Sequence, residues 1–111
     1  MTWEAISADR ELLELAAKAA GIEIYFDEDE DSYRTKASGN RRYWNPLSFD
    51  GDALRLAVGL ELHVINDGMV CIARTGFPRN LGVMESLSTD PYAATRRAIV
   101  RAAAEIGRGM P

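Results

Sequence analysis

Four side chains have the chemistry to hold a small anionic ligand. Arg42, Trp44 and Asn45 lie almost next to one another in the sequence, and Arg96 lies far along the chain. Arginine bonds to phosphate and carboxylate groups, an indole ring stacks on a base, and an amide bonds to a base edge. These four residues form the predicted ligand-binding site, and a nucleotide is the ligand type that suits them.

Two of the four have a competing structural interpretation. Trp44, at the end of a loop, is more typical of a half-buried lid over the core whose N–H is satisfied. Arg96 falls at the margin of the apolar stripe expected on the last helix, where an arginine either extends along the core with its head in water or is held by a buried polar partner. That partner is either a ligand anion or a carboxylate of the second helix, Asp50 or Asp52.

Catalysis and metal binding have few candidate residues. Asp50 and Asp52 could act as an acid–base pair, but both lie where a helix begins and are expected to serve its N-terminus. The chain has one His and one Cys, His63 and Cys71, and two ligands make a poor transition-metal site. His63 is expected to be a partly buried strand residue and Cys71 a buried structural thiol. We therefore predict a protein that is not an enzyme and has no metal or other cofactor.

Five consecutive acidic residues form the most charged segment: Asp27, Glu28, Asp29, Glu30 and Asp31. The run lacks the alternation and the glycine of a calcium-binding loop. It is expected to be a solvated loop that self-repulsion keeps extended. As an alternative function, this loop could dock on a basic surface of another protein.

Composition narrows the class of protein. The chain has 111 residues and a formal net charge of −4, which argues against general binding to nucleic acid. No apolar run approaches the length of a bilayer span, and the N-terminus lacks the pattern of a secretory leader. A cytoplasmic protein without membrane contact is expected, and its lone cysteine fits a reducing compartment.

Helices and hairpins must position these residues. A first helix is expected to be capped by Ser7 and to end at Gly21, with a strand over 22–26 after it. Residues 33–36 and 41–44 are predicted to pair around a turn at 38–40. A second helix is predicted from Asp50 to Gly59, apolar nearly all round and therefore buried.

The C-terminal half has clearer signals. Residues 62–65 and 69–72 are predicted to form a hairpin around the turn 66–68, with one more strand over 82–87. Asp90 is expected to cap a last helix that starts at Pro91 and stops at Gly107. Its apolar stripe is expected to comprise Tyr92, Ile99, Ala103 and Ile106, and a solvated charge ladder is expected from Arg97, Arg101 and Glu105.

These elements predict one α+β domain over residues 1–111. A mostly antiparallel sheet of hairpins is expected to pack against two to three helices, with the first and last helices covering one face. A chain of this size encloses a ligand more readily between subunits, so a homo-oligomer is expected.

Two segments resemble small phage and prophage proteins of the NinX-like group. They are Trp44-Asn45-Pro46 with the helix Gly51-Asp52-Ala53-Leu54-Arg55, and the Ala- and Arg-rich stretch 91–107. The resemblance implies a phage accessory protein that acts in an infected bacterial cell, in counter-defence. Such a protein would bind a host protein or sequester a nucleotide signal.

Three functional hypotheses follow. The first is a non-enzymatic protein that sequesters a small anionic nucleotide through Arg42, Trp44, Asn45 and Arg96. It predicts a concave pocket where the second and last helices meet, with arginine heads aimed inward. The second is an inhibitor that docks on a host protein complex through the acidic loop, which predicts an exposed acidic edge and no pocket. The third is a domain with no ligand.

Overall fold

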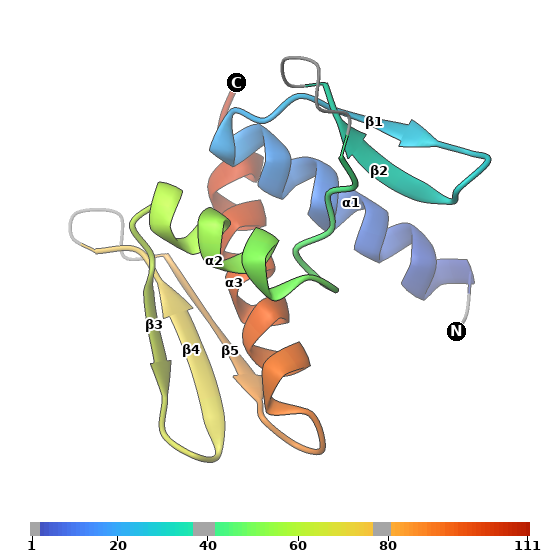
Figure 1. Cartoon of the computed structure of the whole chain (residues 1–111). Coiled ribbons are helices and arrows are strands. Elements are labelled where there is room, and N and C mark those ends of the chain that lie inside the picture. The colour runs from blue at the N-terminus through green and yellow to red at the C-terminus, as the bar shows by residue number, and fades with distance from the viewer. Residues whose placement is uncertain (1–2, 37–41, 77–80) are drawn as a thin grey trace.

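The first and last helices of the fold pack against each other (Figure 1). In the computed structural model, which describes residues 3–36, 42–76 and 81–111, α1 spans Trp3–Ala20 and α3 spans Pro91–Arg108. Their buried faces are rich in alanine, which lets the two backbones approach closely. The shared core of this pair includes Ala16, Ala17, Ala102 and Ala103.

Gly107 lies inside α3, where it allows the closest approach of the two helices. A Cβ atom at this position would overlap with the backbone carbonyl of Leu15 in α1. The prediction that Gly107 stops the helix was therefore wrong. The helix continues to Arg108, and the N–H of Gly109 then bonds to the carbonyl oxygen of Ile106 at 3.2 Å.

The end of α1 follows the prediction, but its start does not. Gly21 has φ +70°, and the N–H of Ile22 bonds to the carbonyl oxygen of Ala17 at 2.9 Å, as a left-handed helix end requires. The helix begins at Trp3, so Ser7 lies within it and does not cap it. Glu4 supplies the negative charge that favours the first turn.

The acidic run forms the end of one strand and the turn of a hairpin. Strand β1 (Ile24–Asp27) pairs antiparallel with β2 (Ser32–Thr35), so Asp27 lies opposite Ser32. The carboxylate of Asp27 accepts N–H bonds from Asp29 at 3.1 Å and Glu30 at 3.3 Å, and it pairs with Arg34 at 2.8 Å. These bonds outweigh self-repulsion, so the expectation of an extended loop was wrong.

The hairpin predicted around residues 38–40 is present in part. Arg34 and Tyr43 form an antiparallel bridge, and the N–H of Trp44 bonds to the carbonyl oxygen of Tyr33 at 2.9 Å. The predicted turn lies outside the described residues. The sequence pattern did not predict the pairing of β1 with β2. These strands are joined by a run of acidic residues, which is an unusual sequence for a turn.

Helix α2 has the predicted bounds, Asp50–Gly59, but not the predicted environment. Its N-cap is Phe49, without a side-chain bond, so neither Asp50 nor Asp52 caps it. Leu54 is 64% exposed and Val58 is 69% exposed. Only one face of α2 packs on the core, and the prediction of a helix buried on all sides was wrong.

Three strands form a second sheet beside α3. They are β3 (His63–Asn66), β4 (Val70–Arg74) and β5 (Gly82–Ser86), in the antiparallel order β3-β4-β5. The turn between β3 and β4 lies where it was predicted. There Gly68 has φ +93°, and the Asp67 carboxylate accepts the N–H groups of Met69 and Val70 at 2.9 Å.

The predicted α+β fold with antiparallel hairpins is confirmed, but the strands divide between two small sheets, and the expectation that the first and last helices cover one face was wrong, because α3 packs on the three-stranded sheet and α1 packs on α3. Helix α3 packs against β4 and β5 on one side and against α1 and α2 on others (Figure 1). None of the helices described is long and apolar enough to cross a membrane.

The start of α3 matches its prediction, whereas the predicted polar and apolar faces match only in part. The carboxylate of Asp90 accepts the N–H groups of Tyr92 and Ala93 at 3.1 Å, with Pro91 in the first turn. Tyr92 is 71% exposed and lies outside the buried stripe, because the core does not extend over the first turn. The expected ladder is also absent among the described contacts: Arg97 pairs with Asp9 of α1 at 2.8 Å.

Candidate ligand groove between α2, α3 and β3

Two of the four predicted site residues, Arg42 and Asn45, contact a buried carboxylate. Asp52 is 3% exposed, and its oxygens accept from Arg42 at 2.7 Å, from the backbone N–H of Asn45 at 2.9 Å and from Arg55 at 3.2 Å. Trp44 is 2% exposed, so it is a core residue and is buried more deeply than the half-buried lid that was expected. Arg42 and the backbone N–H of Asn45 therefore meet at Asp52, whereas Trp44 belongs to the core.

This arrangement fixes the loop 42–47 onto α2. The side chain of Asn45 accepts the N–H of Leu47 at 3.0 Å, which turns the chain toward the helix. Since a buried carboxylate must be paired, Arg42 and Arg55 balance the charge of Asp52, and the Asn45 N–H adds a hydrogen bond. Among the described side chains, no buried nitrogen or oxygen lacks a hydrogen-bond partner. The loop is thus a completed structural network.

Arg96 lies apart from this network and pairs with the other carboxylate of α2. Its Nη1 donates to Asp50 at 2.8 Å and its Nε donates to the carbonyl oxygen of Leu47 at 2.8 Å. The side chain of Arg96 is 18% exposed, whereas that of Asp50 is 73% exposed. The sequence left two kinds of partner for Arg96, a ligand anion or a carboxylate of the second helix, and the structure shows the carboxylate of Asp50.

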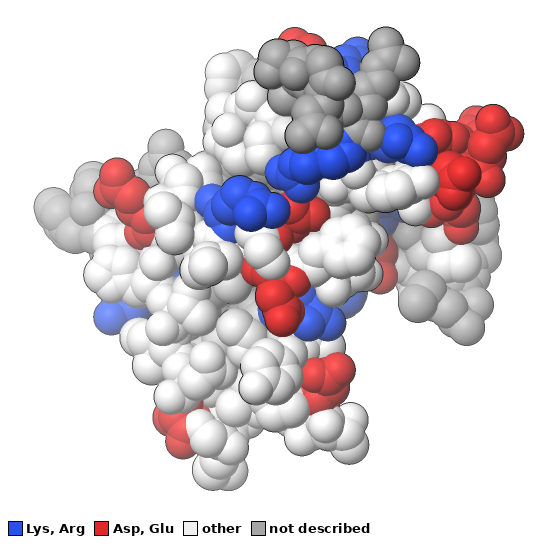
Figure 2. Space-filling model, viewed as in Figure 1, with Lys and Arg blue, Asp and Glu red and all other residues white. Residues whose placement is uncertain are grey.

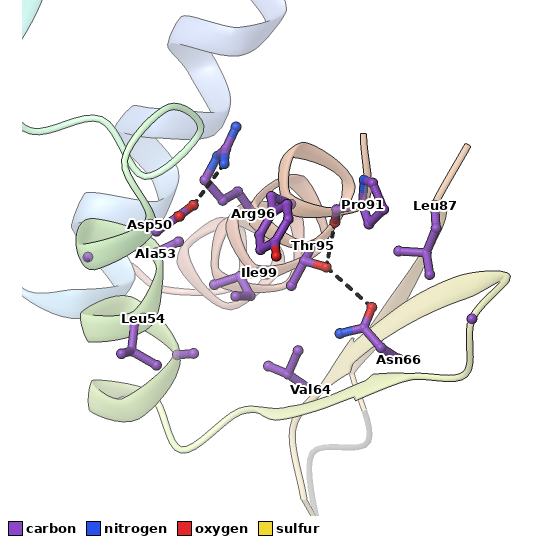
Figure 3. Close-up of a pocket in the computed structure, with 14 residues that line it drawn as sticks. Asp50, Ala53, Leu54, Val64, Asn66, Leu87, Pro91, Thr95, Arg96 and Ile99 are labelled. Atoms are coloured by element: carbon purple, nitrogen blue, oxygen red, sulfur yellow. Dashed lines mark hydrogen bonds and ion pairs between the residues drawn. The ribbon is translucent and has the colours of Figure 1, made fainter. Parts of the chain in front are cut away.

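A groove of about 700 Å³ opens beside Arg96, where α2 and α3 meet β3. Leu54, Val64 and Ile99 point toward one another across it, and the head of Arg96 points away from them toward Asp50 (Figure 3). The surface over α2 and the three-stranded sheet carries few charged side chains in the view of Figure 2. The full lining comprises Asp50, Gly51, Ala53, Leu54, Ala57, Val64, Asn66, Gly68, Leu87, Pro91, Tyr92, Thr95, Arg96 and Ile99.

Polar groups lie at two ends of this apolar lining. At one end is the pair of Arg96 and Asp50. At the other, Thr95 bonds to the amide oxygen of Asn66 at 3.3 Å and to the carbonyl oxygen of Pro91 at 2.8 Å (Figure 3). An apolar floor with a few polar groups at fixed places is the usual construction of a small-molecule site.

The lone cysteine and histidine do not form a second site. Cys71 is fully buried, and this burial raises the pKa of its thiol. Cys71 lies opposite Asn66, whereas His63 lies opposite Arg74 and is exposed, which corrects the expectation of a partly buried histidine. Within residues 3–36, 42–76 and 81–111, no cluster of potential ligands could hold a metal ion.

The sequence interpretation missed most of the groove residues. The apolar pattern predicts Tyr92 in the buried stripe of the last helix and α2 buried nearly all round, so it gives no indication of an open surface between them. A signal existed in α2, because apolar residues on every side of a short helix exceed what one packed face requires. Of the predicted set, only Arg96 lines the groove.

The acidic residues are far less enclosed. Glu28, Asp29, Glu30 and Asp31 are exposed in the turn between β1 and β2, and Asp27 is partly covered by its pair with Arg34. The bond from Arg34 lowers the pKa of Asp27, so this carboxylate stays charged in moderately acidic solution.

Comparisons with known proteins add no further assignment. No family model, no curated protein and no solved structure matches this chain.

Proposed function

We propose that this protein is a non-enzymatic binding protein that sequesters a small nucleotide-type ligand in the groove between α2, α3 and β3. The observation that carries the proposal is the groove itself, about 700 Å³ at the junction of the second and last helices. Pockets of about 300–1,000 Å³ with a mostly apolar lining are typical of sites for small ligands. A phage accessory role in counter-defence, as the NinX-like resemblance implies, suits such a protein.

The lining favours a flat ligand that carries little charge. Ala53, Leu54 and Ile99 offer a surface for a planar ring, and the polar groups of Asn66 and Thr95 lie where a base edge could bond to them. The net charge of −4 and the exposed carboxylate of Asp50 oppose a polyphosphate. A cyclic nucleotide or a nucleoside monophosphate suits the groove better than a triphosphate.

Arg96 is the group proposed to hold the phosphate. Its partner Asp50 is 73% exposed, and an ion pair with one exposed member contributes little, about 0–1 kcal/mol. A ligand phosphate could therefore replace Asp50 at low cost. Arg42 and Asn45 are proposed to act indirectly, since their bonds to Asp52 fix α2, which forms one wall of the groove, and Trp44 is proposed to act only as a buried core residue.

A thermal unfolding screen tests this proposal with the four cyclic nucleoside monophosphates, adenosine and ATP as probes. A ligand that binds only the native state at about 100 times its Kd stabilises by about 2.7 kcal/mol, so a cyclic nucleotide should raise Tm by several degrees. ATP should raise it less. If none of these probes changes Tm, the proposed ligand class is wrong.

Two pairs of variants then localise the binding. Leu54→Glu should abolish the shift because it places a charge on the groove floor, whereas Ile6→Glu, at an exposed site on α1, should keep it. Arg96→Gln should weaken the binding of the cyclic nucleotide but not of adenosine. Arg108→Gln removes an arginine elsewhere on α3 and should change neither.

A second candidate function rests on the acidic turn. Glu28, Asp29, Glu30 and Asp31 are exposed together, and the hydrogen bonds that the Asp27 carboxylate accepts hold the turn in one shape. An ordered acidic tip suits docking on a basic surface of a host protein complex. A pull-down from bacterial lysate tests this function. It compares the wild type with a variant in which residues 28–31 are replaced by the corresponding amides, Asn and Gln, or by Ser. If the neutral form captures the same partner equally well, this docking mode is wrong.

A further inference from the structure

Two polar side chains lie at the end of the groove away from the pair of Arg96 and Asp50. Asn66 is the last residue of β3, and Thr95 lies in α3. Both line the groove, and the Oγ1 atom of Thr95 lies 3.3 Å from the Oδ1 atom of Asn66 (Figure 3). A ligand in the groove therefore meets these two oxygen atoms side by side.

The Thr95 hydroxyl has two acceptors within reach but only one proton to donate. The carbonyl oxygen of Pro91 lies 2.8 Å from it, and the amide oxygen of Asn66 lies 3.3 Å from it. The shorter distance is the usual one for an O–H···O bond, and a helical threonine commonly bonds to the carbonyl group four residues earlier. The proton therefore lies mainly on the bond to Pro91. Thr95 and Asn66 then face each other as two acceptors, without a second proton from Thr95 between them.

The surroundings fix the position of the Thr95 hydroxyl before a ligand binds. The register of β3 and β4 places Cys71 opposite Asn66, and the Cys71 thiol is in hydrogen-bond contact with Thr95. Sulfur is a weak acceptor, so the thiol does not take the hydroxyl proton from Pro91. Thr95 is also branched at Cβ and bonded to its own helix, which restricts its rotamer.

An amino group is the ligand group that satisfies both acceptors. It has two N–H bonds, and it can donate one to Asn66 and the other to Thr95. A keto oxygen at the same place is a third acceptor, and the loss of its bonds to water is not compensated. Rotation of the Asn66 amide does not remove this conflict, because a keto oxygen bonded to the amide NH2 group still lies beside the lone pairs of Thr95.

The nitrogen of the Asn66 amide matches the ring atom next to such an amino group. In Figure 3 this nitrogen points away from Thr95. Asparagine reads adenine with the same two atoms: its oxygen accepts from the amino group, and its nitrogen donates to the neighbouring ring nitrogen. Cytosine has the same order of groups. Hypoxanthine and uracil have the reverse order, a keto oxygen next to a protonated ring nitrogen.

We propose that the groove selects a base with an exocyclic amino group next to an unprotonated ring nitrogen, which is adenine or cytosine. The inference rests on the proposed nucleotide-binding function and adds the class of base to it. Asn66 and Thr95 determine the specificity, whereas Arg96 holds the phosphate and does not distinguish between bases. Guanine is disfavoured because the ribose crowds the ring nitrogen that would accept next to its amino group.

Calorimetric titration of the full chain with two matched pairs of ligands tests the inference. Cyclic AMP is compared with cyclic IMP, and cyclic CMP with cyclic UMP, because the members of each pair differ by an amino or a keto group. The amino member should bind about 10-fold more tightly, toward the lower end of the range for such contacts because Asn66 is exposed to water. The pair whose amino member binds more tightly identifies adenine or cytosine as the preferred ring.

Variants assign the preference to the two side chains. Thr95→Val removes the hydroxyl at similar volume and should reduce the preference to about 2-fold or less, as should Asn66→Ala. Thr95→Ser keeps the hydroxyl and should retain the preference. Arg96→Gln should weaken both members of a pair without changing their ratio. Since the preference is a ratio measured within one variant, a loss of stability alone does not change it.

The outcomes separate this inference from the proposed function. Equal binding of the two members by the wild type, or tighter binding of the keto members, overturns the inference and leaves nucleotide binding in place. A preference that Thr95→Val and Asn66→Ala both leave unchanged also overturns it. If none of the four cyclic nucleotides binds, the proposed function is wrong, and the inference is wrong with it.

Discussion

Gly107→Ala should destabilise the protein, although alanine is the better helix former. In the interior of an exposed helix this exchange stabilises by about 1 kcal/mol. At Gly107 the added methyl group would overlap with the backbone carbonyl of Leu15. A backbone atom cannot rotate aside as a side chain can, so α1 and α3 must move apart.

The cost can be worked from the packing of this helix pair. Overpacking a well-filled site costs about 1–3 kcal/mol, and the upper end applies because the obstacle is backbone. After the gain in helix propensity, a net loss of about 2 kcal/mol in the free energy of unfolding is expected. For a chain of this size, that loss lowers Tm by about 8 °C.

Urea unfolding and thermal unfolding, both followed by circular dichroism, measure this effect. Gly59→Ala is the matched control, because an added Cβ at Gly59 meets nothing within 4 Å. It should stabilise by about 0.5–1 kcal/mol. The reasoning is refuted if Gly107→Ala is neutral or stabilising, since α1 and α3 would then not approach as closely as the structure has them.

Further predictions concern carboxylates and the thiol. Asp52→Asn should lower the free energy of unfolding in urea by about 2 kcal/mol, because it removes the charge that its two arginine partners require. As the control, Asp50→Asn should change it by less than about 0.5 kcal/mol. The N–H groups of Val70 and its neighbour lower the pKa of Asp67, so its contribution to stability is present above its ordinary pKa and is lost as the pH falls from about 5 to about 3. Asp67→Asn should flatten that part of the pH profile of the urea midpoint, and an unchanged profile would contradict the assignment. Cys71 should react with Ellman's reagent at least about 100-fold more slowly in the native protein than in urea, because burial both hides the thiol and raises its pKa. Rapid reaction of the native protein would show that this strand opens.

Local signals in the sequence predicted the elements well. Asp90 and Pro91 mark the start of α3, and the turn at Asp67 and Gly68 marks the first hairpin of the three-stranded sheet. These signals act within a few residues, through caps and turn geometry that any surroundings would allow. The bounds of α2 followed from the same kind of evidence.

Contacts between distant segments could not be predicted in the same way. The role of Gly107 depends on Leu15, and these residues lie on helices that are far apart in the sequence. The role of Asp52 depends on which donors the preceding loop brings to it. Sequence patterns predicted that four residues act together, whereas the structure places Arg42 and Asn45 on Asp52, buries Trp44 in the core and places Arg96 at the rim of a groove.

The groove itself follows from an imbalance that the pattern contained. Helix α2 has apolar residues on more sides than α3 can cover, and Leu54 and Val58 remain exposed. A hydrophobic pattern shows which faces of a helix are apolar, but it does not show how many neighbouring helices or sheets cover those faces. The apolar pattern therefore predicts burial for the side of α2 that the structure leaves open.

The pairing of α1 with α3 has a consequence for biosynthesis. Asp9 bonds to Arg97 and Glu11 bonds to Arg108 across 88 and 97 residues of chain. During translation, α1 leaves the ribosome before every other element of this fold, and α3 leaves after them. The alanine-rich face of α1 therefore stays without its partner until nearly all of the fold has been made. A ribosome stalled after β5 would carry a chain that has its hairpins but no helix core, so this core forms only after α3 has been synthesised.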